Sequence, residues 1–287
     1  MHEILMGFSL TYWPDDAVIE GIEEIAAANF PGFEAPPSIV ARYEERLDVF
    51  REILERTDLE LVAIYNPGNF LIEDRLEEDV EIAMNTARFL HRVGAQFLVV
   101  SCGPRRPEGN TKEDWTNLLK ALDELGNRCL DSAIQLCVMQ HHGTIIETRE
   151  DIDRLMDETP EHCVFFCPDL GELRSMMIDP VPLVADYFDR LPYVRFRDVL
   201  DRKMLDRKNR RRLRLVNKAK ENPTPLPNPV GVALGDGLSV LQPVWDLLNE
   251  REFDGWAMTV VDEPRNAAST VMEKSRQFLE NYFEILF

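Results

Sequence analysis

Two adjacent histidines and a glutamate follow an apolar run in the middle of the chain. Residues 134–139 are almost entirely apolar and too short for a helix, so they predict a strand that is buried on both faces. His141 and His142 come directly after this strand, and Glu147 precedes a helix that Thr148 is suited to cap. Imidazoles and carboxylates exchange protons and bind metals. We therefore expect catalytic groups here, with either His141 or His142 facing the site.

Regular alternation of strands and helices must position these groups. Eight strands alternate with eight helices at nearly even spacing, which is the pattern of a (β/α)8 TIM barrel, and a doubly wound open sheet is the alternative. We expect one α/β domain over residues 1–287. The expected strands are residues 4–10, 33–34, 59–65, 97–101, 134–139, 163–167, 193–197 and 256–261. The expected helices include residues 17–28, 39–56, 80–90, 112–133, 149–158, 181–190, 240–249 and 267–286.

Further polar side chains lie at the carboxyl ends of the other strands, where ligands bind in barrels of this kind. Asp169 follows the sixth strand, and Arg195 and Arg197 share one face of the seventh. Glu34 closes the second strand and is either a polar site residue or a charge at a helix entry. Trp13 follows the first strand and either walls a sugar pocket or packs in the core.

The connection after the seventh strand is unusually long. Residues 199–233 are first basic and then rich in proline, and they should lie on the active-site face. Within them, residues 202–220 carry a net charge of +9, so the rest of the chain is close to −29. A lid, an oligomer contact and a disordered arm are all compatible with this composition. The charge contrast predicts that the segment contacts an anionic substrate or another copy of the chain.

Composition excludes several classes of function. The overall charge of −20 argues against general nucleic-acid or anionic-membrane binding. No apolar run approaches the ~20 residues that span a bilayer, and no signal pattern opens the chain, so we expect a cytoplasmic protein. The cysteines contain no CxxC pair, and we expect buried free thiols at Cys102, Cys129, Cys137, Cys163 and Cys167.

Four motifs, in order along the chain, resemble the xylose isomerase-like barrel superfamily of sugar isomerases, epimerases and apurinic endonucleases. They are HHGTIIETREDID (141–153), CPDLGE (167–172), YVRFRD (193–198) and LGDG followed by FDGW (234–237 and 253–256). The similarity is greatest to inosose dehydratases and sugar-phosphate-isomerase-like proteins. It implies a barrel that acts on a polyhydroxylated small molecule.

The resemblance also implies a divalent metal, Mn²⁺, Co²⁺, Mg²⁺ or Zn²⁺, held by residues after strands five to eight. Glu147 and Asp169 match two of the four ligand positions, whereas Arg195 replaces a histidine and Val260 replaces a glutamate. A guanidinium does not become a ligand, and valine has no donor atom. The metal site is therefore partly lost. A rearranged site could use Glu172, Asp262 and Glu263.

The reaction that the resemblance favours is proton abstraction next to a carbonyl, giving isomerisation, epimerisation or elimination. Glu147 and Asp169 would act as bases or residual ligands, with His141 or His142 as acid–base group or hydroxyl contact. Arg195 or Arg197 would stabilise negative charge. Alternatively, Arg195 occupies the position of the metal and neutralises Glu147 and Asp169. A third interpretation is a non-catalytic barrel that serves as a subunit or binding module.

Overall fold

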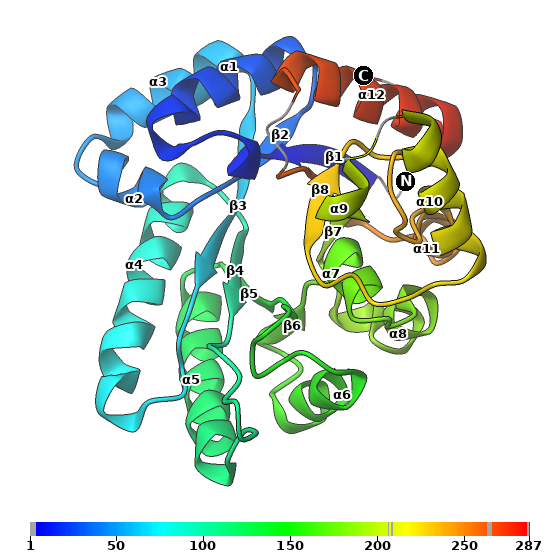
Figure 1. Ribbon diagram of the computed structural model, residues 1–287. Helices are drawn as coiled ribbons and strands as arrows, with labels where there is room; N and C mark the ends of the chain where they lie inside the picture. Colours follow the sequence, from blue (N-terminus) through cyan, green and yellow to red (C-terminus); the bar gives the residue numbers. More distant parts are fainter. Residues whose placement is uncertain (1–3, 206, 208, 263–265, 286) are drawn as a thin grey trace.

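Eight parallel strands close into a barrel in the computed structural model, which describes residues 4–205, 207, 209–262, 266–285 and 287 (Figure 1). The barrel strands follow one another in chain order, and the last of them, β9, pairs with both β1 and β7. The prediction of a (β/α)8 barrel is confirmed. The strands are β1 (Ile4–Ser9), β2 (Gly32–Ala35), β3 (Glu60–Pro67), β4 (Phe97–Ser101), β5 (Gln135–Val138), β6 (Val164–Phe166), β7 (Tyr193–Asp201) and β9 (Gly255–Val260).

A single bridge closes the barrel between β6 and β7. Asp169 and Arg195 pair in parallel register, and the Arg195 N–H donates to the carbonyl of Pro168 at 2.9 Å. β6 is only three residues long, so this bridge joins its following loop to the middle of β7. The closure therefore brings two of the predicted site residues side by side.

Helices surround the barrel because each has one apolar face that packs on the strands. The expected helix 39–56 is divided in two around Glu44, and a short helix follows β6 where none was predicted. The helices are α1 (Val18–Ala27), α2 (Ser38–Tyr43), α3 (Leu47–Thr57), α4 (Leu76–Val93), α5 (Lys112–Asp131), α6 (Arg149–Glu158), α7 (Leu170–Ser175), α8 (Pro180–Asp186), α11 (Gln242–Glu250) and α12 (Ala268–Phe278).

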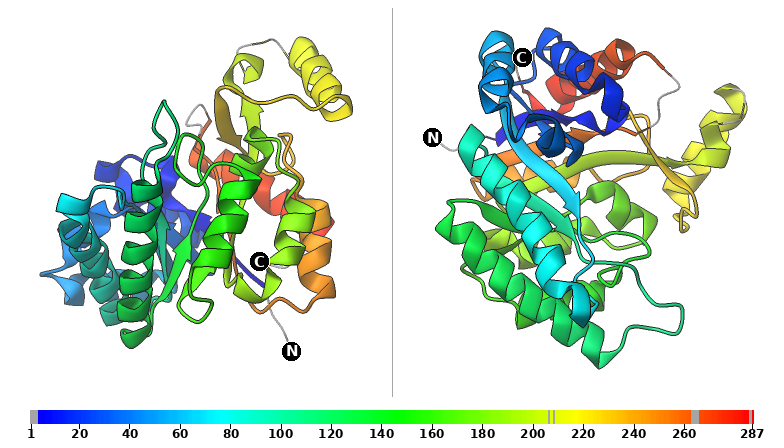
Figure 2. Two further views of the ribbon diagram at one scale, coloured as in Figure 1. Left: turned by 90° about the horizontal axis from the view of Figure 1, so that it is seen from below. Right: turned by 90° about the vertical axis from the view of Figure 1, so that its left-hand side faces the viewer.

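Residues 199–233, the long connection after the seventh strand, form a segment that projects from the barrel and that we call the arm (Figure 2). β7 extends to Asp201 and pairs in antiparallel register with β8 (Pro229–Val232). The helices α9 (Arg202–Leu205) and α10 (Asn209–Glu221) lie between these strands. A small apolar cluster, which includes Leu200, Val216 and Leu226, packs the arm.

The barrel interior and the layer between strands and helices form separate apolar clusters. All five cysteines are buried and free, as predicted. Burial raises the pKa of the Cys102, Cys137 and Cys167 thiols far above the usual range, so these thiols stay protonated. Among the described helices, none is long and apolar enough to cross a bilayer.

Candidate active site

A buried arginine occupies the centre of the barrel mouth. Arg195 Nη2 lies 3.1 Å from Glu34 Oε1, and Nη1 lies 3.1 Å from Asp169 Oδ2. Nη1 is also 2.7 Å from the sulfur of Met139, and the guanidinium lies over the ring of Tyr65 at 5.4 Å. Residues on or just after strands two, three, five and six thus converge on this cation from strand seven. The contact with Asp169 is one that the sequence predicted, and the contact with Glu34 is new.

Each carboxylate that holds Arg195 is itself fixed by neighbours. Glu34 accepts hydrogen bonds from the Ser9 hydroxyl at 2.8 Å and the Tyr193 hydroxyl at 2.9 Å. Both donors belong to barrel strands and are buried. A buried charge is stable only when it is paired and hydrogen-bonded, and Glu34 meets both conditions.

Asp169 has a second task at the start of α7. Its Oδ1 accepts the backbone N–H groups of Gly171 at 3.0 Å and Glu172 at 2.9 Å, which caps the helix. Its Oδ2 faces Arg195. The same carboxylate therefore ties the short helix to the centre of the mouth.

The charge state of Arg195 follows from these contacts. Burial alone would lower the pKa of the guanidinium, but Glu34 and Asp169 outweigh burial, and the pKa of Arg195 ends above its ordinary value. Arg195 therefore remains a cation at every physiological pH.

A second arginine lies nearer the opening. Arg197 Nη1 is 2.6 Å from Glu172 Oε1, and Nη2 pairs with Asp262. Burial would raise the pKa of Glu172, but Arg197, His141 and the backbone N–H of His142 together bring it below its usual value. Glu172 is thus an anion at neutral pH.

His141 faces this second ion pair. Its Nε2 lies 3.7 Å from Glu172 Oε1, and its Nδ1 lies 2.8 Å from the His142 carbonyl oxygen. A carbonyl only accepts, so Nδ1 carries the hydrogen in that contact and Nε2 is the nitrogen that can exchange a proton. The His141 side chain is 41% exposed, so a ligand can reach it.

A cavity of about 140 Å³ lies between these groups. Both arginines, His141, Glu172 and Asp262 line it, so five of the polar residues that the sequence singled out meet at one opening. Arg195 Nε and Arg197 Nε are buried N–H groups without a hydrogen-bond acceptor among the described residues. The remaining lining residues are Thr11, Tyr65, Met139 and Val260.

Glu147 lies outside this group. His142 Nδ1 is 2.8 Å from one of its oxygens, and Arg105 Nε is 2.9 Å from the other. Arg105 also pairs with Asp151. The expectation that Arg195 neutralises Glu147 needs correction. The loop after β5 turns away from the barrel axis, so Glu147 meets Arg105 from the neighbouring loop, and His142 accompanies it.

For Trp13, the structure shows the packing alternative and not the wall of a sugar pocket. Its ring packs edge-on against Phe8 and Tyr12, and its Nε1 donates to Glu24 at 3.2 Å. It is not among the residues that line the mouth cavity. Trp13 therefore packs the first helix onto the first strand, because the chain turns sideways immediately after β1.

The donor set does not fit the divalent metal that the resemblance implies. Met139 after β5, Arg195 on β7 and Val260 on β9 line the cavity, and none of these side chains offers an oxygen or imidazole nitrogen. The Arg195 guanidinium instead contacts Asp169. In the described part of the chain, no cluster of His, Cys, Asp or Glu is arranged to hold a metal ion.

The substitutes considered for the lost ligands have other partners. Glu172 and Asp262 both bind Arg197, while Glu263 lies outside the described residues. Tyr65, Met139 and Arg105 were not predicted as site residues. Tyr65 and Met139 could have been predicted, because strand alternation and a position near the end of a strand direct their side chains into the mouth. Arg105 lies in an irregular loop, where no such pattern applies.

Asp198 anchors the loop that follows the arm. Its carboxylate accepts the backbone N–H groups of Gly235, Gly237 and Ser239 at 2.8 to 2.9 Å. A side chain at Gly237 would collide with this carboxylate, so only glycine fits there. The LGDG motif therefore has a structural role, because its backbone is hydrogen-bonded to Asp198 on β7.

Comparison with known proteins agrees with this architecture. Residues 22–282 match the family described as xylose isomerase-like TIM barrel. An inosose dehydratase of Clostridium botulinum (strain Alaska E43 / Type E3) is 26% identical over 275 residues, which cover 91% of this chain and 88% of the relative.

Solved structures show the same fold at low sequence identity. The 3-keto-D-glucoside 4-epimerase of E. coli, in its apo form, matches with a TM-score of 0.74 and 14% identity, covering 97% of this chain and 100% of that one. A xylose isomerase-like TIM barrel protein from Mycobacterium smegmatis in complex with magnesium matches with a TM-score of 0.71 and 14% identity, covering 98% and 96%. These likenesses establish the fold alone.

Proposed function

The chain belongs to the xylose isomerase-like TIM barrel family, and on that premise we propose that it is a sugar or cyclitol isomerase, epimerase or dehydratase in which Arg195 stands in place of the metal. The substrate class follows the inosose dehydratases, which it resembles over most of its length. The reaction is proton abstraction from a carbon next to a carbonyl. This chemistry needs a base, a group that stabilises the enolate oxygen and a dry pocket.

His141 is the acid–base group of this proposal. Its Nε2 is open to the mouth, and Glu172 at 3.7 Å stabilises the imidazolium that forms when Nε2 takes a proton. Arg197 holds Glu172 as an anion. In an isomerisation the imidazolium then returns the proton to the neighbouring carbon on the same face, and in a dehydration it protonates the departing hydroxyl. An epimerisation needs a second acid on the opposite face of the carbon.

Arg195 and Arg197 supply the positive charge. Each has an Nε–H without an acceptor, and both line the cavity that the substrate would enter. A developing oxyanion is stabilised most where fixed donors face it in a site that excludes water. The observation that carries the proposal is this pair of buried guanidinium groups beside an accessible imidazole.

Solvent exchange tests the proposal directly. The protein is incubated in D₂O with a panel of inososes and keto-sugars, in the presence of a chelator, and deuterium uptake at the carbon next to the carbonyl is followed by NMR. We expect uptake with the wild type, a roughly 100- to 10,000-fold loss in His141→Gln and little change in the neighbouring control His142→Gln. Equal rates in both variants would contradict the role of His141.

A binding module without turnover is the second candidate. One observation favours it, namely that each mouth carboxylate is paired with an arginine, Glu34 and Asp169 with Arg195, and Glu172 and Asp262 with Arg197. Such pairing weakens a carboxylate as a base. If calorimetry detects binding of a panel compound but no deuterium uptake follows, the binding module is supported.

We also infer that the chain forms homo-oligomers through the arm. α10 exposes basic side chains, including Arg211, Arg214 and Lys218, and Leu213 beside them is 62% exposed. The rest of the chain is strongly acidic, so a second copy offers a complementary surface.

A further inference from the structure

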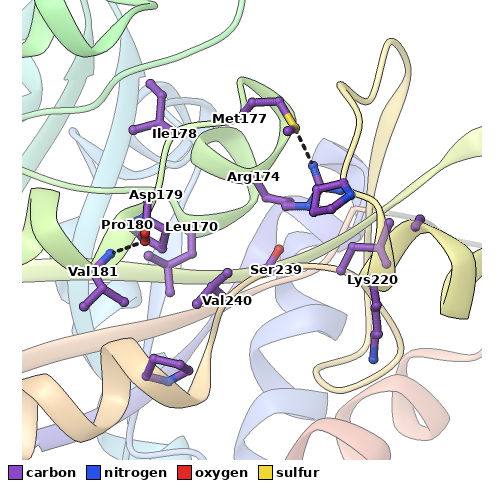
Figure 3. A pocket seen from close by; sticks show the side chains of 14 residues that line it. Leu170, Arg174, Met177, Ile178, Asp179, Pro180, Val181, Lys220, Ser239 and Val240 are labelled. Atoms are coloured by element: carbon purple, nitrogen blue, oxygen red, sulfur yellow. Dashed lines mark hydrogen bonds between the residues drawn. The ribbon is translucent and has the colours of Figure 1, made fainter.

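A second cavity lies beside the barrel, between α7, α8 and the arm (Figure 3). Its volume is about 700 Å³, within the range of small-molecule sites. The walls are mostly apolar side chains from the α7–α8 segment and the loop before α11, with Arg174, Asp179, Lys220 and Ser239 as polar members. The apolar and proline residues are Leu170, Met177, Ile178, Pro180, Val181, Ala219, Pro223, Leu238, Val240 and Pro243.

Arg174 is a buried cation without an acidic partner among the described residues. The residue is 8% exposed, and Nη1 donates to the Thr224 carbonyl at 3.1 Å and approaches the Met177 sulfur at 3.3 Å. Its Nη2 is buried and has no acceptor. Burial lowers the pKa of Arg174, and no carboxylate offsets this effect. An unpaired buried guanidinium is costly, so a missing anion is the simplest complement.

Arg190 shows what a purely structural buried arginine looks like in this chain. Its Nε and Nη2 donate to the Val164 carbonyl, Nη1 donates to the Met156 carbonyl, and Nη2 also reaches the Thr159 hydroxyl. Every nitrogen of that guanidinium has an oxygen partner. Arg174 differs because its Nη2 amino group has no acceptor among the described residues.

A second unpaired polar atom lines the same cavity. The hydroxyl oxygen of Ser239 is buried and has no partner among the described residues. Lys220, an exposed residue at the end of α10, adds a positive charge to the lining. The acidic lining residue, Asp179, accepts the Val181 N–H at 3.1 Å as the cap of α8. Two buried donors without acceptors and a lysine among mostly apolar walls therefore call for a ligand with an anionic head and an apolar body.

We propose that this cavity binds a small organic carboxylate, with Arg174 Nη2 and the Ser239 hydroxyl donating to the carboxylate and the apolar walls covering its body. A guanidinium forms charge-assisted hydrogen bonds with a carboxylate, and a singly charged carboxylate on an apolar body suits the mostly apolar walls better than a free phosphate does. The site is separate from the barrel mouth, and the inference does not depend on the proposed reaction.

The site would couple the arm to the mouth. Arg174 already holds the returning segment of the arm through Thr224, and the Leu226 N–H donates to the Ser175 carbonyl. Glu172 lies on the same short helix as Arg174. A carboxylate bound between α7 and the arm therefore contacts both the helix that carries Glu172 and the segment that follows α10.

Calorimetric titration with octanoate tests the proposal. We expect octanoate to bind the wild type about tenfold more tightly than octanamide, which has the same body without the charge, and more tightly than inorganic phosphate. Arg174→Gln should weaken octanoate binding about tenfold and leave octanamide binding unchanged. The matched surface control Arg154→Gln should bind octanoate as the wild type does.

Val181→Trp provides a variant that leaves Arg174 in place. The indole should narrow the cavity and weaken octanoate binding, whereas octanoate held by the arginines of the mouth would be unaffected. The proposal is overturned if octanoate fails to bind the wild type, if octanamide or phosphate binds as tightly as octanoate, or if either cavity variant binds octanoate like the wild type. Thermal melting of each variant checks its folding, and Val181→Trp decides if Arg174→Gln does not fold.

Discussion

Arg195 Nη1 lies 3.1 Å from Asp169 Oδ2 at the point where the barrel closes between β6 and β7. The backbones of the two residues pair at the same place. The backbone bridge closes the sheet between β6 and β7, and the ion pair of the same two residues fixes a cation in the mouth. We propose that this guanidinium stands where the resemblance implies a metal.

Removing the guanidinium should be costly because it leaves two buried carboxylates unpaired. We expect Arg195→Met to lower the free energy of unfolding by about 3–5 kcal/mol. The loss should be smaller in a Glu34→Gln background, since one of the two carboxylates is then neutral. Urea denaturation of the four proteins in this cycle measures both values. An equal loss in the two backgrounds would show that Glu34 and Arg195 do not interact.

The two glutamates near the mouth should behave differently. Glu172→Gln removes the anion beside His141 and should lower the rate of deuterium uptake, or the affinity for the ligand if no reaction occurs. Glu147→Gln breaks only partly exposed pairs with Arg105 and His142. It should cost about 1 kcal/mol of stability or less and leave function unchanged. A larger loss of function in Glu147→Gln than in Glu172→Gln would show that Glu147 belongs to the site.

Asp198 should make stability depend on pH. Burial raises its pKa to about 6, although three backbone N–H groups oppose this effect. Because the folded-state pKa lies above the unfolded value of about 3.9, the stabilising contribution is present below about pH 4 and is lost as the pH rises through 6. The full difference is about 3 kcal/mol.

Comparison with Asp198→Asn isolates this group from the other acids. The stability of the wild type relative to the variant should fall by about 3 kcal/mol between pH 4 and pH 7 in urea titrations. A constant difference across this range would mean that Asp198 does not change its charge there.

Charge reversal on the arm tests the proposed self-association. Arg211→Glu with Arg214→Glu should shift the protein toward monomer in light-scattering measurements, and high salt should act in the same direction on the wild type. The control Arg56→Glu with Arg88→Glu places the same charge change on α3 and α4. A monomeric wild type, or equal effects of both pairs, would refute the arm as the contact.

The barrel itself could be predicted because strand and helix periods repeat regularly along the chain. The expected strand 97–101 coincides with β4, and the expected ends of the other strands differ from the observed ones by a few residues. The structure of the arm could not be predicted in this way. Its basic and proline-rich composition hides the antiparallel pairing of β7 with β8, which depends on contacts between residues about 30 positions apart.

The mouth could be predicted only in part. Strand ends indicated Asp169, Arg195 and Arg197, but Arg195 also pairs with Glu34, which lies 161 positions away on a strand that does not adjoin β7. No local pattern encodes such a contact. The expected contact between Glu147 and Arg195 was wrong for a different reason. A family motif gives the order of residues but not the direction in which a loop turns.

Metal analysis of the purified protein tests the central claim most directly. The protein is prepared without chelators, dialysed against Mn²⁺, Co²⁺, Mg²⁺ or Zn²⁺ and then against buffer, and its metal content is measured by plasma mass spectrometry. If Arg195 takes the place of the metal, the divalent metal content stays far below one ion per chain, and a chelator leaves ligand binding and deuterium uptake unchanged. One tightly held divalent ion per chain, whose removal abolishes both, would contradict the account.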